Sequence, residues 1–404
     1  MVNFNYLINK EHYGEALYKD RRQKRTLGCQ FIKNATVLPY KLKSDGNLGG
    51  GVVNSEGNYI PGSWLGYNED ASYVPENLKK SDETVIYLGM FYVIWGHMIT
   101  DNMKRLWFLK SDVYKNYFKN CKLIYVQYDG FEFETSIVHF HFAKILEILG
   151  IDYKNIYPVK EATTYKNLIL PDESFYYIPE KGKYFTNEYV ETIDIIRHHF
   201  LKYYGTLNHT SLPFKKVYFF HGMREQIGEE RLAAYFQSKG YVIINPYKFS
   251  FEEELAILIN CESFATPIGS TAHNSIFLRD NTEVILIPRG NYLTDYQEAL
   301  NQVHDLRINY IDSTLSIFSK GWDIAFYYFV SNNLKRYFGD EVDEEHQFNN
   351  EDFKTFIIYL KNSLSKGLQL DQKAMEYYGG TARNFLNQLK KQEILLKEAG
   401  ITMN

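Results

Sequence analysis

The chain of 404 residues contains only three cysteines, Cys29, Cys121 and Cys261. They are far apart and odd in number, so they form neither a disulfide framework nor the paired spacing of a zinc site. We therefore expect no bound metal, buried thiols and a reducing, cytoplasmic compartment. The first twenty residues lack the basic and apolar regions of a signal peptide. The most apolar window, residues 85–99, is shorter than the roughly 20 residues that cross a bilayer.

The chain also lacks an excess of positive charge, since its formal net charge is −4. This balance argues against nucleic acid as a partner. One local basic run lies between Lys19 and Arg25. It is compatible with peripheral contact with anionic lipid at the inner face of a membrane or with a polyanionic acceptor, and the alternative is a solvated surface, as for most such runs. Three cofactor and metal motifs are missing: Gly-x-Gly-x-x-Gly, a Walker A loop and an Asp-x-Asp after a strand. We expect no resident cofactor.

Apolar residues are plentiful, at 45% of the chain, which excludes a disordered protein. In the second half, short apolar runs alternate with segments of helical spacing, a pattern that predicts βαβ units and a parallel sheet. The apolar runs are residues 217–220, 241–244, 264–268 and 284–287. We predict an α/β protein with an N-terminal domain over residues 1–205, a second domain over 206–312 and a helical region over 313–404. A cleft between the two α/β domains is the expected ligand site.

Polar side chains follow two of these runs at the point where a strand should end. His221 and Arg224 follow the first run, and Gly269 and Ser270 follow the third. Ligands of parallel sheets bind beyond the carboxyl ends of the strands, arginine binds phosphate with two hydrogen bonds, and small residues before a helix expose N–H groups to anions. The alternative is that Arg224 pairs on the surface with a nearby glutamate.

His97 and Asp101 form a second candidate site. They are four residues apart at the expected start of a helix, so they share one face. A carboxylate beside an imidazole can serve as a general base. The alternative is that Asp101 only complements the helix dipole while His97 occupies a polar niche in the core.

Taken in order, these segments resemble the family 61 glycosyltransferases over roughly residues 48–290. The resemblance is carried by Gly49-Gly-Gly-Val-Val-Asn-Ser-Glu-Gly-Asn-Tyr, Trp95-Gly-His97-Met-Ile-Thr-Asp101, Arg224 with Ile227-Gly-Glu229, Phe249-Ser-Phe-Glu-Glu253 and Gly269-Ser270 with Asn274. The chain departs from the family at Ile268, where a histidine is common, near His221, where a second arginine is usual, and near Gly228, where an asparagine is usual.

The resemblance implies a GT-B architecture of two Rossmann-like domains. It also implies metal-independent, inverting transfer of a sugar from a nucleotide-diphosphate donor to a glycan or lipid-linked acceptor, as in bacterial relatives that build capsular or cell-wall polysaccharide. Asp101, with or without His97, would deprotonate the acceptor. The expected donor-binding residues are Arg224, His221, Glu229, Glu253, Glu254, Gly269, Ser270, Thr271, His273 and Asn274. Within this set, Glu253 or Glu254 would bind the ribose, and Asn274 would support the phosphate loop.

Two other functions stay open at this point. The departures near His221 and at Ile268 are compatible with a phosphoryl transferase or an epimerase on the same scaffold. The long helical region after residue 311 is compatible with a non-catalytic binding or assembly protein that keeps a degenerate transferase fold. The sequence also leaves a homo-oligomer open.

Overall fold

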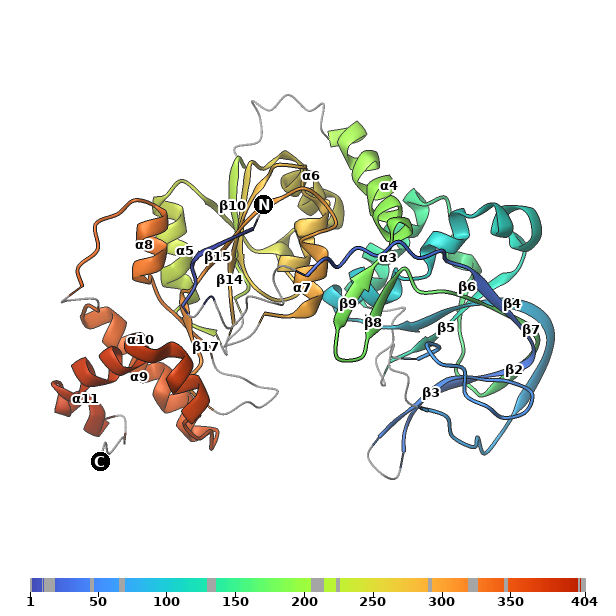
Figure 1. Cartoon of the computed structure of the whole chain (residues 1–404), viewed down its shortest axis with the longest axis horizontal. Helices are drawn as coiled ribbons and strands as arrows, with labels where there is room; N and C mark the ends of the chain where they lie inside the picture. The colour runs from blue at the N-terminus through green and yellow to red at the C-terminus, as the bar shows by residue number, and fades with distance from the viewer. Residues whose placement is uncertain are drawn as a thin grey trace. The chain divides into compact units, whose positions relative to one another are not determined.

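The chain divides into two compact units in the computed structural model (Figure 1). One unit comprises Asp20–Tyr203, and the other combines Met1–Lys19 with Tyr204–Asn404. The structure describes residues 2–8, 10, 19–43, 47–64, 70–128, 136–204, 214–222, 226–289, 293–318, 326–344, 348–398 and 400. The N-terminal segment lies with the later residues because β1 (Val2–Tyr6) pairs in parallel with β15 (Arg307–Ile311).

The Asp20–Tyr203 unit is built on a mixed six-stranded sheet with the order β3-β2-β7-β4-β5-β6. Strand β2 is antiparallel to β3 and β7, whereas β7, β4, β5 and β6 run parallel. Its strands are β2 (Cys29–Leu42), β3 (Leu48–Val53), β4 (Lys79–Phe91), β5 (Lys122–Gln127), β6 (Ile156–Pro158) and β7 (Thr163–Pro171). The antiparallel hairpin of β8 (Phe175–Ile178) and β9 (Gly182–Phe185) follows.

The helices of this unit are α2 (Trp95–His97), α3 (Ile137–Ile148) and α4 (Asn187–Tyr204). Ser136 caps α3 by accepting a hydrogen bond from the backbone N–H of His139. Gly150, which has a positive φ, lies just after the end of this helix. The helical spacing over residues 98–109 does not give one regular helix. It forms a π-helical turn, Met98–Asn102, and a 3-10 turn, Leu106–Lys110.

The second unit contains an all-parallel six-stranded sheet with the order β1-β15-β14-β13-β10-β12. The four strands β10 (Lys216–Phe219), β12 (Val242–Ile244), β13 (Ser263–Pro267) and β14 (Glu283–Ile287) confirm the four apolar runs. Helices α5 (Glu229–Ser238), α6 (Phe251–Asn260) and α7 (Asp295–Leu300) follow β10, β12 and β14 in the chain. With the first unit, this alternation confirms an α/β protein.

The C-terminal part combines helices with a small sheet. The helices are α8 (Asn332–Tyr337), α9 (Asn350–Ser365), α10 (Gln372–Lys390) and α11 (Glu393–Glu398). The sheet has the order β11-β17-β16, formed by Gln226–Ile227, Phe326–Tyr328 and Thr314–Leu315. The prediction that residues 313–404 are helical is therefore wrong at Thr314–Leu315 and Phe326–Tyr328, which are strands. Tyr327 is fully buried against Phe356 and Phe385 of the following helices, and aromatic residues favour strands when packed in this way.

Two further observations bear on the sequence predictions. In the part of the chain that the structure describes, no helix has the length and apolar character needed to cross a bilayer. All three cysteines are free, but only Cys261 is buried, since Cys29 is exposed and Cys121 is intermediate. The expectation of three buried thiols is thus met at one position.

Candidate functional site

The His97–Asp101 pair lies just beyond the carboxyl end of β4, a central strand of the Asp20–Tyr203 unit. The loop between the strand and the pair is fixed by Asn102. Its side-chain amide donates to the carbonyl of Tyr92 at 3.1 Å, and its amide oxygen accepts from the N–H of Tyr92 at 2.9 Å. These two bonds return the chain to the strand end and hold the π-helical turn that carries Asp101.

The two side chains are in direct contact. Nδ1 of His97 lies 2.7 Å from Oδ2 of Asp101, and the hydroxyl of Thr100 donates to the same oxygen at 3.0 Å. The side chain of Asp101 is 8% exposed, whereas that of His97 is 36% exposed. The ring of Tyr92 stacks on the imidazole with centroids 4.4 Å apart. A buried carboxylate therefore orients an imidazole that solvent reaches.

Electrostatics separate the roles of the two residues. Burial alone would raise the pKa of Asp101, but Lys183, the hydrogen bond from His97 and Lys104 together outweigh it and hold that pKa well below its usual value. Asp101 is consequently ionised throughout the physiological range and is a weak base by itself. A permanently charged carboxylate on Nδ1 suits it to orient His97 and to stabilise the protonated imidazole.

In the other unit, two of the candidate donor residues, His221 and Gly269, follow neighbouring strands of the parallel sheet. Strand β10 leads to β12 on one side and the chain then returns to β13 on the other side of β10, so the winding reverses between β10 and β13. Such a switch point is where open parallel sheets bind ligands, beyond the carboxyl ends of the strands. His221 follows β10 and Gly269 follows β13, which puts both at this point.

The loop after β10 is shaped by Glu229 at the start of α5. Its two carboxylate oxygens accept hydrogen bonds from the N–H groups of His221, at 2.8 Å, and Gly222, at 3.0 Å. Burial lowers the pKa of His221 to about 4, with a further contribution from Arg289, so its imidazole is neutral at physiological pH. Glu229 thus acts on the backbone of the loop. Arg224 lies outside the described residues.

The segment after β13 forms a short 3-10 helix, Ala272–Phe277, in place of the expected α-helix. Thr271 is buried, with its hydroxyl 3.1 Å from that of Thr266, while Ser270 is partly exposed. The ring of His273 stacks on that of Tyr296, with centroids 6.4 Å apart.

The buried amide of Asn274 joins this segment to helix α6, because its Nδ2 donates to Oε1 of Glu254 at 2.6 Å. Burial raises the pKa of Glu254 to about 8, and the bond from Asn274 only partly offsets this. Glu253 completes the capping box of α6 with Ser250 through two exposed hydrogen bonds. The contacts of both glutamates lie within the protein, in the packing and capping of α6.

Sequence reasoning missed Arg289. This residue follows β14, the strand beside β13, and its guanidinium lies against Gly269. A Cβ atom at Gly269 would stand 2.9 Å from Nη1 of Arg289, closer than a real Cβ tolerates. The signal that could have found it is the rule that singled out His221 and Gly269, namely a polar residue just beyond the carboxyl end of a predicted buried strand.

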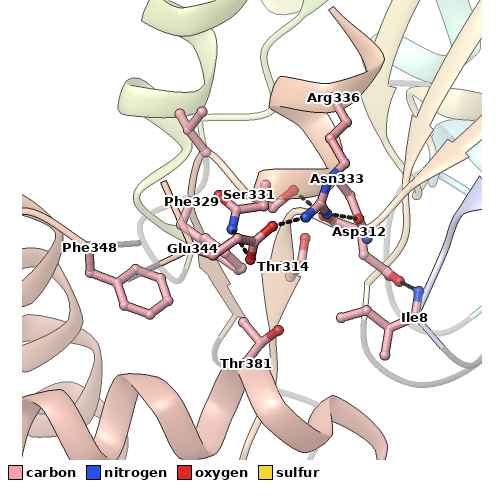
Figure 2. Close-up of a pocket in the computed structure, with 12 residues that line it drawn as sticks. Ile8, Asp312, Thr314, Phe329, Ser331, Asn333, Arg336, Glu344, Phe348 and Thr381 are labelled. Atoms are coloured by element: carbon pink, nitrogen blue, oxygen red, sulfur yellow. Dashed lines mark hydrogen bonds and ion pairs between the residues drawn. The ribbon is translucent and has the colours of Figure 1, made fainter. Parts of the chain in front are cut away.

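A separate cavity of about 190 Å³ lies at the end of β15, near the same sheet edge. Figure 2 shows Asp312 directed at the backbone N–H of Ile8, and Arg336 paired with Glu344. Burial raises the pKa of Asp312 to about 7. None of the predicted site residues lines this cavity.

Other predicted contacts can be located as well. In the basic run, Arg21 is buried and donates to the carbonyl of Lys181 at 2.8 Å, Arg22 donates to Asn187, and Arg25 lies 3.7 Å from a carboxylate oxygen of Asp172. These three guanidinium groups are engaged by their own unit. Among the described residues, no group of three or more histidine, cysteine or acidic side chains is arranged to hold a metal ion.

Residues 95–285 match the family model described as Glycosyltransferase 61. The match supports a glycosyltransferase. It begins two residues before His97 and ends within β14, so it spans the His97–Asp101 pair and the strand ends at His221 and Gly269. A comparison with curated proteins gave no match.

Proposed function

We propose that the protein transfers a sugar from a nucleotide-diphosphate donor to a glycan or lipid-linked acceptor, with inversion and without a metal ion. The observation that carries the proposal is the oriented His97–Asp101 pair inside the segment that matches glycosyltransferase family 61. The proposal includes a GT-B arrangement, in which the Asp20–Tyr203 unit supplies the base and the sheet containing β10 and β13 binds the donor. A cytoplasmic location and a role in capsular or cell-wall polysaccharide belong to the same proposal.

In the proposed reaction, His97 is the base. Its second ring nitrogen, Nε2, takes the proton from the acceptor hydroxyl as the acceptor oxygen attacks the anomeric carbon. The bond from that carbon to the phosphate oxygen breaks, and the nucleoside diphosphate leaves with the electron pair. Asp101 holds Nδ1 and stabilises the imidazolium that forms, which its ionised and buried state suits it to do.

On the donor side, the residues at the switch point have separable tasks. Glu229 holds the loop after β10 through two backbone N–H groups, and Asn274 is held by Glu254. These contacts favour a positioning role for the two glutamates, while Gly269 and Ser270 lie where a phosphate would approach. Arg224 remains a proposed diphosphate ligand on the strength of the sequence resemblance alone.

The test is a comparison of Asp101→Asn and His97→Gln with the wild type. A nucleotide sugar is first selected from a panel by thermal shift, and release of nucleoside diphosphate is then measured with acceptor glycans. We expect each variant to lose about 10²- to 10⁴-fold in turnover with unchanged donor affinity, because the lost step is proton transfer. Asp194→Asn, which changes a partly exposed aspartate of α4 that pairs with Arg197, is the control and should keep its rate.

Two results would overturn the proposal. Unchanged turnover in both variants would remove the pair from the mechanism. Release of a nucleoside monophosphate in place of the diphosphate would identify phosphoryl transfer, because the bond broken would then be a P–O bond of the bridge between the two phosphate groups.

A further inference from the structure

Arg289 and Gly269 occupy equivalent places on neighbouring strands. In the parallel pairing of β13 with β14, Pro267 lies opposite Ile287, and both Gly269 and Arg289 stand two residues further along. The guanidinium fills the space that a side chain at residue 269 would take, since a Cβ there would lie 2.9 to 3.1 Å from three of its atoms. Arg289 therefore reaches over the strand end at the switch point itself.

The guanidinium is held in place from one side. Its Nε donates to the hydroxyl of Tyr328 at 3.0 Å, and its central carbon lies 5.7 Å from the centre of the Phe326 ring. Both partners belong to β17, which pairs in parallel with β11, the strand after β10 in the chain. The contacts fix the plane of the guanidinium and use only Nε, so the two terminal nitrogens are not needed to hold it in place.

The positive charge of Arg289 has no counterion within the described part of the chain. No carboxylate there forms an ion pair with it, and Nη2 is buried without a hydrogen-bond partner among those residues. Arg289 is partly exposed, but a guanidinium N–H group that is buried without a partner is costly, and an anionic ligand that accepted its hydrogen bond would reduce that cost. A fixed fork of two N–H-bearing nitrogens also matches the oxygens of a phosphate group.

His221 and Glu229 are near Arg289 but form no ion pair with it. His221 is neutral because burial and Arg289 depress its pKa to about 4. Both carboxylate oxygens of Glu229 accept hydrogen bonds from backbone N–H groups, and burial raises its pKa although those bonds and Arg289 partly offset this effect. The cationic side chain at this strand end in the described structure is thus Arg289.

We propose that Arg289 binds the diphosphate group of the donor and neutralises the charge that the leaving nucleoside diphosphate gains. This inference rests on the proposed function for the identity of the ligand. It assigns the phosphate contact to a residue beyond the segment that matches the family model, and it explains why residue 269 is glycine.

The experiment measures binding of inorganic pyrophosphate and of a panel of nucleoside diphosphates by calorimetry to the full chain. Arg289→Gln should weaken pyrophosphate and nucleoside diphosphates by about 10- to 100-fold, because charge-assisted hydrogen bonds are lost. Arg289→Lys should fall between that variant and the wild type, since it keeps the charge but lacks the fork. Arg307→Gln is the matched control, because Arg307 is exposed at the opposite end of the sheet, and it should bind as the wild type does.

The outcomes separate the inference from the proposed function. Wild-type protein that binds no pyrophosphate, or an Arg289→Gln variant that binds it unchanged, overturns the inference even if sugar transfer is observed. Loss of pyrophosphate binding in a folded Arg289→Gln variant upholds it even if the wild type transfers no sugar. Unfolding temperatures of the ligand-free proteins establish folding, and pyrophosphate should raise that of the wild type and of Arg307→Gln but not that of Arg289→Gln.

Discussion

Glutamine at residue 254 should make the protein more resistant to alkaline unfolding. Glu254 on α6 is 5% exposed, and its Oε1 accepts a hydrogen bond from Asn274. Burial raises its pKa from 4.5 to about 8. Between these two values the folded protein holds a proton that the unfolded chain has released, so stability falls as the pH rises through this window. Glu254→Gln keeps an acceptor for Asn274 but has no proton to lose.

The size of the effect follows from the pKa difference. Each pKa unit corresponds to about 1.4 kcal/mol, so the wild type gives up roughly 3 kcal/mol by pH 7 and about 5 kcal/mol above pH 8, relative to pH 4.5. For a folding unit of this size, each kcal/mol of change in the free energy of unfolding shifts the unfolding temperature by about 2–4 °C. The advantage of Glu254→Gln over the wild type should therefore grow by roughly 10 °C or more from pH 5 to pH 9.

The assay is thermal unfolding at intervals from pH 5 to pH 9, read as the difference between variant and wild type. Titratable groups that both proteins share, including His221, contribute equally to the two unfolding temperatures, so their contributions cancel in the difference. The depressed pKa of His221, about 4, makes stability fall as the pH drops below 6.5. Glu262→Gln, at an exposed ion pair with Lys215, should show no trend. Parallel curves for wild type and Glu254→Gln would refute the reasoning, because they would mean that Glu254 is ionised in the folded protein.

Two further substitutions have expected effects on stability, measured by urea unfolding. Gly228→Ala should lower the free energy of unfolding by more than about 3 kcal/mol, since its Cβ would lie 2.1 Å from the carbonyl oxygen of Tyr328 at a positive φ. Gly240→Ala, at a similar φ with open space around it, should lower it by about 1–2 kcal/mol. Equal losses in the two variants would contradict the clash. Glu173→Gln should lower the free energy of unfolding by about 3–5 kcal/mol, because it leaves the buried cations Lys104 and Arg105 without their shared carboxylate. Glu161→Gln, at an exposed pair with Lys79, is the control and should lower it by under about 1 kcal/mol. A small loss for Glu173→Gln would mean that water reaches the two cations.

The strands of the second unit could be predicted because each is a short apolar run bounded by turn residues. The pairing of β1 with β15 could not, since nothing local in residues 2–6 indicates a partner some 300 positions later. Phe326–Tyr328 was misread for a related reason. An apolar aromatic run of this length is compatible with a strand or a helix, and its pairing with Gln226–Ile227 decides between them.

The candidate site was predictable to the extent that it depends on residue type and spacing. The contact between His97 and Asp101 follows from their separation of four residues. The cations that keep Asp101 ionised do not follow from spacing, because Lys183 lies on a hairpin far along the chain. Arg289 could have been found by extending the strand-end rule to the fourth apolar run.

The buried carboxylates that the sequence put forward have different partners, and the partners decide what each can do. Cations and an imidazole surround Asp101, so it stays charged and can act on His97. The two carboxylate oxygens of Glu229 accept hydrogen bonds from the backbone N–H groups of His221 and Gly222, so Glu229 holds the backbone that follows β10. Glu254 faces one amide in an apolar setting, and its raised pKa keeps it protonated at neutral pH. Since a protonated carboxyl offers no negative charge to a proton in transfer, Asp101 is the one of these three suited to support a base.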